Sequence, residues 1–149
     1  IAVQTAKVAR RFGVTPKVAM LSFSNFGTSE ELRTDRIEEA IAIARELDSD
    51  LVIDGPMQVD TALVPEIQKD YPFMSFEGPA NVLICPNLAS ANIAYKLLQR
   101  IAGAEMTGPI LEGLSKPAHV LQRGDSVRDV VHMAAICAVD AQRHAKQRL

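Results

Sequence analysis

The residues best suited to chemistry in this sequence lie between positions 122 and 129. Arg123 and Gly124 come directly before a Ser-Val-Arg-Asp stretch at 126–129. A serine followed three residues later by an acidic side chain is typical of a capped helix start. A guanidinium beside the free N–H groups of a helix N-terminus can hold a phosphate or another oxyanion. The alternative is a surface arginine next to an ordinary helix cap.

A second candidate site is the loop 22–29, which follows an apolar run and leads into a helical pattern. One interpretation is that Ser24, Asn25 and the backbone around Gly27 bind a phosphate. The loop lacks the Gly-Lys-Ser/Thr ending of a P-loop. Because loops rich in serine and threonine also serve as plain caps, both interpretations stay open.

Two more loops carry polar side chains after apolar runs. In the first, Asp54 ends a run, and Gln58 and Asp60 follow two residues apart, which would let both approach one cleft. The two carboxylates lack the histidine or third carboxylate of a metal site, so no metal is predicted, and turn or cap roles compete with binding. In the second loop, Asn87 and Asn92 offer amides for the polar parts of a ligand, or simple turn chemistry.

The histidines and cysteines predict no catalytic centre. His119, His132 and His144 fall in unrelated segments without a Ser-His-Asp arrangement. Cys85 and Cys137 lie in separate apolar stretches, which favours buried reduced thiols over a zinc site or a redox pair.

The elements that must position these loops alternate between strand and helix patterns. Apolar runs predict strands at 18–23, 51–54, 82–85, 109–111 and 119–121. Helical spacing predicts a helix from the N-terminus to Phe12 and another after a Thr28–Glu31 cap. This alternation indicates an α/β fold, in which ligands collect at the carboxyl ends of the strands.

Two more helices are predicted in the second half of the chain. One covers 90–102 and ends before Gly103, a suitable C-terminal cap. Its inward face should consist of Ile93, Leu97, Leu98 and Ile101. The last helix, from Val127 to about residue 148, is longer than a domain of this size needs, so we expect it to pack against something outside this chain.

Composition limits the classes of protein. With 149 residues, 48% of them hydrophobic, and a net charge of −2, the chain can form one domain with a core and has no electrostatic reason to bind nucleic acid. It contains no apolar run of membrane-spanning length and no signal peptide, so we expect a cytoplasmic protein without a membrane partner. It begins at Ile1 within a helical pattern, which suggests a fragment of a longer polypeptide.

Several blocks in order resemble the phosphate acetyl/butyryltransferase family. They are Val18–Ser24, Asp54–Asp60, Gly78–Leu88 and Asn92–Lys96. The resemblance implies the isocitrate/isopropylmalate dehydrogenase-like fold, a three-layer α/β/α architecture of two domains facing across a cleft. The chain would be the second domain, with an α/β core over about 14–125. Residues 126–149 would form the helix that returns to the absent first domain.

In active family members an acetyl group moves between coenzyme A and phosphate. The resemblance places Arg123 at the phosphate-binding position and Asp129 at the position of the base that makes the thiolate. It also shows a departure, because Gln122 stands where phosphotransacetylases carry a serine. Asn25 and Asn87 differ from the family pattern as well. Loss of a hydroxyl that stabilises developing charge would lower the transfer rate by roughly 10²–10³.

The segments 119–122 and 139–142 resemble instead the phosphotransacetylase-like C-terminal part of bacterial NADP-dependent malic enzymes. That resemblance implies a domain that binds acetyl-CoA, regulates malate decarboxylation and forms homo-oligomers. NADP and a divalent metal would belong to the malic enzyme region, which is absent here. The expected ligand contacts are Ser24, Asn25, Gln58, Asp60, Asn92, Gln122, Arg123 and Asp129. Two alternatives are an active phosphate acetyltransferase and a module for assembly alone.

Overall fold

The computed structural model describes residues 1–27 and 35–146. The chain forms two compact units, Ile1–Ala94 and Tyr95–Leu149. The first unit holds the sheet, and the second holds the end of helix α5 and all of helix α6. The predicted Thr28–Glu31 cap and the last residues of the predicted final helix lie outside the described residues.

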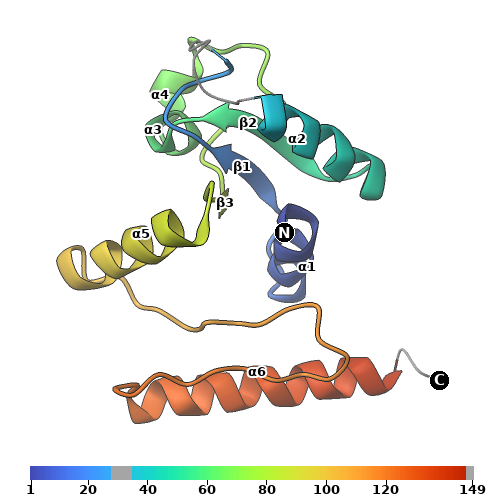
Figure 1. The fold of residues 1–149 in the computed structure, drawn as a ribbon, viewed down its shortest axis with the longest axis vertical. Helices are drawn as coiled ribbons and strands as arrows, with labels where there is room; N and C mark the ends of the chain where they lie inside the picture. The colour runs from blue at the N-terminus through green and yellow to red at the C-terminus, as the bar shows by residue number, and fades with distance from the viewer. Residues whose placement is uncertain (28–34, 147–149) are drawn as a thin grey trace. The chain divides into compact units, whose positions relative to one another are not determined.

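The first unit is built on three parallel strands, β1 (Lys17–Leu21), β2 (Val52–Met57) and β3 (Val82–Ile84), in the order β2-β1-β3 (Figure 1). In the register, Val18 of the central strand lies opposite Ile53 on one side and Val82 on the other. All three strands were predicted. Strand β1 ends at Leu21, two residues before the predicted end. Strand β2 continues three residues further than predicted, because after an irregularity in the register Met57 pairs with Leu21 of β1.

Helices cover both faces of this sheet. On one face, α1 (Ala2–Arg11) and α2 (Asp35–Leu47) bury Ala2, Ala6, Ile41 and Ala44 against the strands. On the other face, α3 (Val59–Leu63) packs on β1, α4 (Pro65–Gln68) follows it, and the loop that carries Phe76 completes the second core cluster. The α/β class and the α/β/α layering predicted from the sequence are confirmed.

Helix α5 (Leu88–Ile101) confirms the predicted helix but not its predicted burial. Gly103 has φ +64°, and the N–H of Ala104 donates to the carbonyl of Leu98 at 3.2 Å, so the predicted C-terminal cap is present. The face predicted to point inward is instead exposed by 51–80% at Ile93, Leu97, Leu98 and Ile101. The prediction of burial was wrong for this chain because none of the described residues covers that face.

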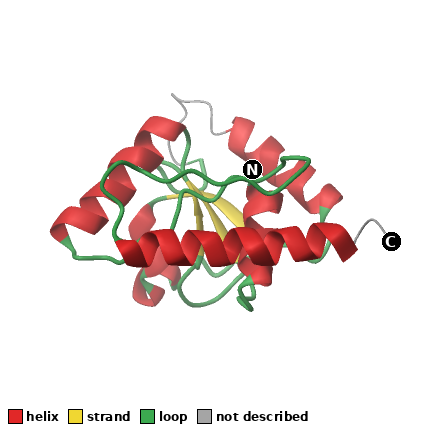
Figure 2. Ribbon diagram, turned by 90° about the horizontal axis from the view of Figure 1, so that it is seen from below, coloured by secondary structure: helices red, strands yellow, loops and turns green. Residues whose placement is uncertain are grey.

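Helix α6 (Val127–Lys146) is joined to α5 by residues 102–126, which form neither helix nor strand (Figure 2). The strands predicted at 109–111 and 119–121 are therefore wrong. Their apolar side chains are not enclosed, since Leu111, Val120 and Leu121 are 41–50% exposed. The two segments are connected by a side-chain hydrogen bond and not by backbone strand pairing. The N–H of Leu111 donates to Nδ1 of His119 at 3.2 Å.

That histidine also connects the segment to α6. Its Nε2 lies 3.4 Å from Oδ2 of Asp140, and its side chain is only 4% exposed. The separation is an electrostatic contact rather than a well-formed hydrogen bond. The same helix makes a weak contact with the segment through Cys137, whose Sγ donates to the carbonyl of Pro117 at 3.9 Å. Within the described ranges 1–27 and 35–146, no helix has the length and apolar character required to cross a membrane.

Candidate functional site

The start of α6 is built by the cap that the sequence predicted. Oδ2 of Asp129 accepts the backbone N–H of Ser126 at 2.9 Å and its hydroxyl at 2.7 Å, and the N–H of Asp129 donates to the Ser126 hydroxyl oxygen at 3.2 Å. The side-chain hydrogen bond from Ser126, followed by its backbone hydrogen bond, lowers the pKa of Asp129. The carboxylate is therefore ionised at neutral pH.

A tight turn before this cap presents Arg123. The N–H groups of Gly124 and Asp125 donate to the carbonyl of Gln122 at 2.9 and 3.1 Å. The Gln122 N–H in turn donates to Oδ2 of Asp125 at 2.6 Å. These bonds close the turn around Arg123, whose side chain stays exposed.

The turn and the cap line a pocket of about 250 Å³ in the second unit, which we call the basic pocket. It brings together three of the predicted site residues, Gln122, Arg123 and Asp129. Its full lining is Lys96, Gln99, Arg100, Met106, Gly108, Gln122, Arg123, Gly124, Asp125 and Asp129. The pocket therefore contains three cationic side chains and two carboxylates.

Sequence reasoning missed the contribution of α5 to this pocket. Lys96, Gln99 and Arg100 have the three- and four-residue spacing that places side chains on one helix face. That spacing indicates one helix face, but it does not show that this face lies beside residues 122–129. Arg and Lys side chains that line one pocket suit an oxyanion, and an arginine fork can bind a phosphate through two parallel hydrogen bonds.

Arg128 is a cation of the same segment that does not line the basic pocket. Its Nη1 donates to Oε1 of Glu105 at 2.8 Å. The hydrogen bond and charge of Glu105 raise the pKa of Arg128. It is therefore a natural control for the pocket arginines.

The predicted contacts of the first unit play structural roles in the loop after β1. Oδ1 of Asn25 accepts the N–H of Gln58 at 2.7 Å, and its Nδ2 donates to the hydroxyl of Tyr71 at 3.1 Å. Nε2 of Gln58 donates to the carbonyl of Phe23 at 2.5 Å. These bonds fasten the loop to the end of β2. Ser24 is 6% exposed, and among the described residues its hydroxyl has no hydrogen-bond partner.

The remaining predicted residues do not join these groups. Oδ1 of Asp60 accepts the N–H of the next residue, Thr61, at 2.9 Å, and Asn92 is exposed on α5 outside the lining of the basic pocket. Oδ1 of Asn87 accepts the N–H of Ser90 at 2.9 Å, which caps the start of α5.

Asp54 also has a structural role. Its oxygens accept the N–H groups of Gly55 at 2.9 Å and Ser75 at 2.6 Å. Gly55 has φ +138°, and a Cβ there would lie 2.6 Å from the carbonyl oxygen of Met20. The Asp-Gly pair therefore allows β2 to approach β1 closely. Among the described residues, no cluster of metal-ligating side chains forms.

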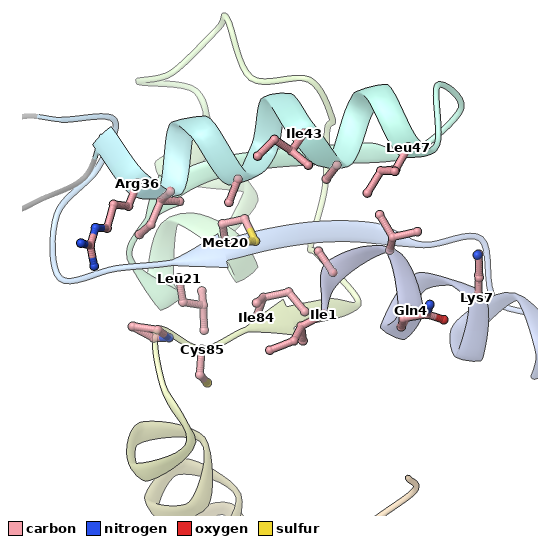
Figure 3. Close-up of a pocket in the computed structure, with 16 residues that line it drawn as sticks. Ile1, Gln4, Lys7, Met20, Leu21, Arg36, Ile43, Leu47, Ile84 and Cys85 are labelled. Atoms are coloured by element: carbon pink, nitrogen blue, oxygen red, sulfur yellow. The ribbon is translucent and has the colours of Figure 1, made fainter. Parts of the chain in front are cut away.

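The first unit contains a second, different cavity of about 670 Å³. Figure 3 shows it lined by Ile43 and Leu47 of α2, Met20 of β1 and Ile84 of β3. Among the described residues of its lining, Lys7 and Arg36 carry the charged side chains. Because these described residues include no carboxylate or histidine to pair with them for acid–base chemistry, the basic pocket is the candidate functional site.

Comparisons with known proteins identify the family of this chain. The NADP-dependent malic enzyme of Salmonella typhimurium is 47% identical over 145 residues, which are 95% of this chain and 19% of that enzyme. The phosphate acetyltransferase of Acetivibrio thermocellus is 49% identical over 131 residues, 87% of this chain and 40% of that protein. A crystal structure of a phosphotransacetylase from Streptococcus pyogenes superposes with a TM-score of 0.89 at 43% identity, covering 95% of this chain and 44% of that one.

The chain thus spans less than half the length of each of these relatives. Its fold is the phosphotransacetylase fold, as the structural match at 43% identity shows. The family model described as phosphate acetyl/butaryl transferase matches residues 1–138, which include the whole basic pocket. The chain belongs to the phosphate acetyl/butaryl transferase family.

Proposed function

We propose that this chain is the acyl-CoA-sensing region of a cytoplasmic NADP-dependent malic enzyme, in which it regulates the oxidative decarboxylation of malate to pyruvate. The observation that carries the proposal is the basic pocket, which is lined by Lys96, Arg100 and Arg123. Gln122 also lines it, where the family resemblance implies a serine. Three cations in a pocket of this size suit the phosphate groups of acetyl-CoA. The identity with the Salmonella malic enzyme over 95% of the chain supports the parent assignment.

Gln122 favours sensing over acetyl transfer. A serine hydroxyl at this position can donate a hydrogen bond to charge that develops during transfer, and an amide with a longer stem places its donor elsewhere. Removing one such donor lowers transfer rates by roughly 10²–10³. Binding of an acyl-CoA, in contrast, requires only the cationic side chains of the basic pocket. A bound acyl-CoA would then regulate the enzyme through unequal affinity for two of its states. NADP and a divalent metal would be held by the malic enzyme region outside this chain.

The test is malate-dependent NADP reduction by the full-length protein with and without acetyl-CoA. We expect the rate to change on addition of acetyl-CoA, and the change to be lost in Arg123→Ala. Arg128→Ala removes a neighbouring arginine that is paired with Glu105 outside the pocket, so it should keep the response. A protein that reduces NADP with malate but ignores acetyl-CoA would contradict the sensing role.

A second candidate function is phosphate acetyltransferase activity. It is favoured by the presence of Arg123 and Asp129 in one pocket and by the 49% identity with the Acetivibrio enzyme. In this reaction Arg123 would hold phosphate and Asp129 would accept the thiol proton of coenzyme A. The lowered pKa of Asp129 keeps it ionised but makes it a weaker base. Acetyl phosphate formed from acetyl-CoA and phosphate, with no malate activity, would establish this alternative.

We also propose that the chain contributes to homo-oligomerisation. The supporting observation is the apolar face of α5, where Ile93, Leu97, Leu98 and Ile101 are 51–80% exposed. Contiguous apolar surface of this kind commonly marks an interface.

A further inference from the structure

The basic pocket contains a carboxylate that no predicted role explains. Asp125 is half-buried in the lining, and its Oδ2 accepts the N–H of Gln122 at 2.6 Å. That N–H belongs to the turn that presents Arg123. A negatively charged oxygen therefore already occupies one of the donors nearest to the arginine.

The second carboxylate of the pocket is committed to the helix cap. Asp129 Oδ2 accepts both the N–H and the hydroxyl of Ser126. Asp125 closes only the turn, through the hydrogen bond from the Gln122 N–H. With Lys96, Arg100 and Arg123 positive and the two carboxylates negative, the lining has one surplus positive charge. Removal of the Asp125 charge would raise that surplus to two.

We propose that Asp125 is a specificity-determining residue of this anion site, an internal anion that competes with the phosphate group of the ligand for the surrounding cations. This inference rests on the proposed function, since it requires the basic pocket to bind a phosphate-bearing ligand. Asp125 lowers the affinity for every anion, and it does so most for doubly charged ones because the repulsion grows with ligand charge. It thereby limits occupancy of the site by free phosphate.

The physical size of the effect follows from Coulomb's law. A unit charge several ångströms from a bound anion, near the protein surface, changes its affinity by roughly three- to tenfold at low salt. A dianion should show about the square of the change seen for a monoanion. Raising the ionic strength should reduce both effects.

The decisive variant is Asp125→Asn in the full-length protein. An amide oxygen can still accept the N–H of Gln122, so the variant removes the charge and keeps the turn. Binding of inorganic phosphate at pH 8 and of nitrate, a monoanion of similar hydrogen-bonding type, would be measured by calorimetry. Asp70→Asn is the matched control, because it makes the same change in net charge at an exposed site outside the lining. Melting curves confirm that each variant is folded.

We expect Asp125→Asn to bind nitrate roughly three- to tenfold more tightly than the wild type and phosphate roughly ten- to a hundredfold more tightly, while Asp70→Asn matches the wild type. Equal phosphate affinity in the two variants, or weaker binding by Asp125→Asn, would overturn the inference and leave the proposed anion site intact. If the wild type and Asp125→Asn both fail to bind phosphate and acetyl-CoA, the proposed function itself is wrong. A variant that melts early is replaced by Asp125→Ser, which also keeps an oxygen acceptor.

Discussion

At the scale of single residues, Arg123 is the side chain on which the anion site depends most. It lies at the tip of a hydrogen-bonded turn and lines the basic pocket. Charged hydrogen bonds to a phosphate are worth about 1.5–3 kcal/mol, so Arg123→Ala should weaken acetyl-CoA binding roughly 10- to 100-fold. Arg123→Lys keeps the charge without the planar fork and should lose less. Calorimetry on the full-length protein checks both, and an unchanged dissociation constant in Arg123→Ala would exclude its role.

Asp129 gives a pH-dependent prediction. Hydrogen bonds from Ser126 lower its pKa in the folded state below the ordinary value of 3.8. A depressed carboxylate pKa contributes stability that is fully present above the unfolded value and is lost as pH falls through the lower folded value. Stability from this cap should therefore be constant above about pH 4–5 and decline below it. Melting at pH 7, 4 and 3 should show a smaller acid-induced loss in Asp129→Asn than in the wild type; equal losses would contradict the coupling.

At the scale of elements, residues 102–126 are held to α6 by a buried histidine rather than by strand pairing. His119 accepts the N–H of Leu111 and lies 3.4 Å from the carboxylate of Asp140. His119→Ala should destabilise the protein by about 1–3 kcal/mol, since it leaves polar groups without this partner. His119→Asn can restore an acceptor near Nδ1 and should recover part of the loss. Urea unfolding measures the free energy of unfolding of both variants. An unchanged value in His119→Ala would show that the contacts of His119 do not stabilise the protein.

Gly103, the C-terminal cap of α5, gives a prediction that depends only on local backbone conformation. Gly103 has φ +64° and open space around the position of a Cβ, so a side chain there meets backbone strain but no clash. Gly103→Ala should lower the free energy of unfolding by about 1 kcal/mol, and Gly103→Asn by less, because asparagine tolerates the left-handed region. Denaturant unfolding of the two variants checks this order. The opposite order would mean that space rather than conformation limits the position.

At the scale of the whole molecule, the sequence predicted the features that depend on residues close together in the chain and missed those that depend on contacts between distant residues. The Ser126–Asp129 cap, the Gly103 cap and the three strands of the first unit follow from residues a few positions apart, and the structure confirms them. The strands predicted at 109–111 and 119–121 failed because a strand also needs a neighbour, which an apolar run does not specify. Lys96 and Arg100 were missed for the same reason, since only folding brings them beside residues 122–129.

The exposed apolar face of α5 should form part of an interface between subunits. Exposing apolar side chains to water is unfavourable, and association would remove that surface from water. Leu97 and Leu98 are 51% and 56% exposed, and they lie on α5 beside pocket residues without lining the pocket themselves. Leu97→Glu should therefore shift the full-length protein to a smaller assembly in sedimentation experiments. Leu114→Glu places the same charge on a 46% exposed leucine that is not part of α5 and should leave the assembly unchanged. Identical sedimentation of wild type and Leu97→Glu would remove this face from the interface. If assembly falls while the phosphate affinity stays the same, oligomerisation and anion binding use separate surfaces of the same helix.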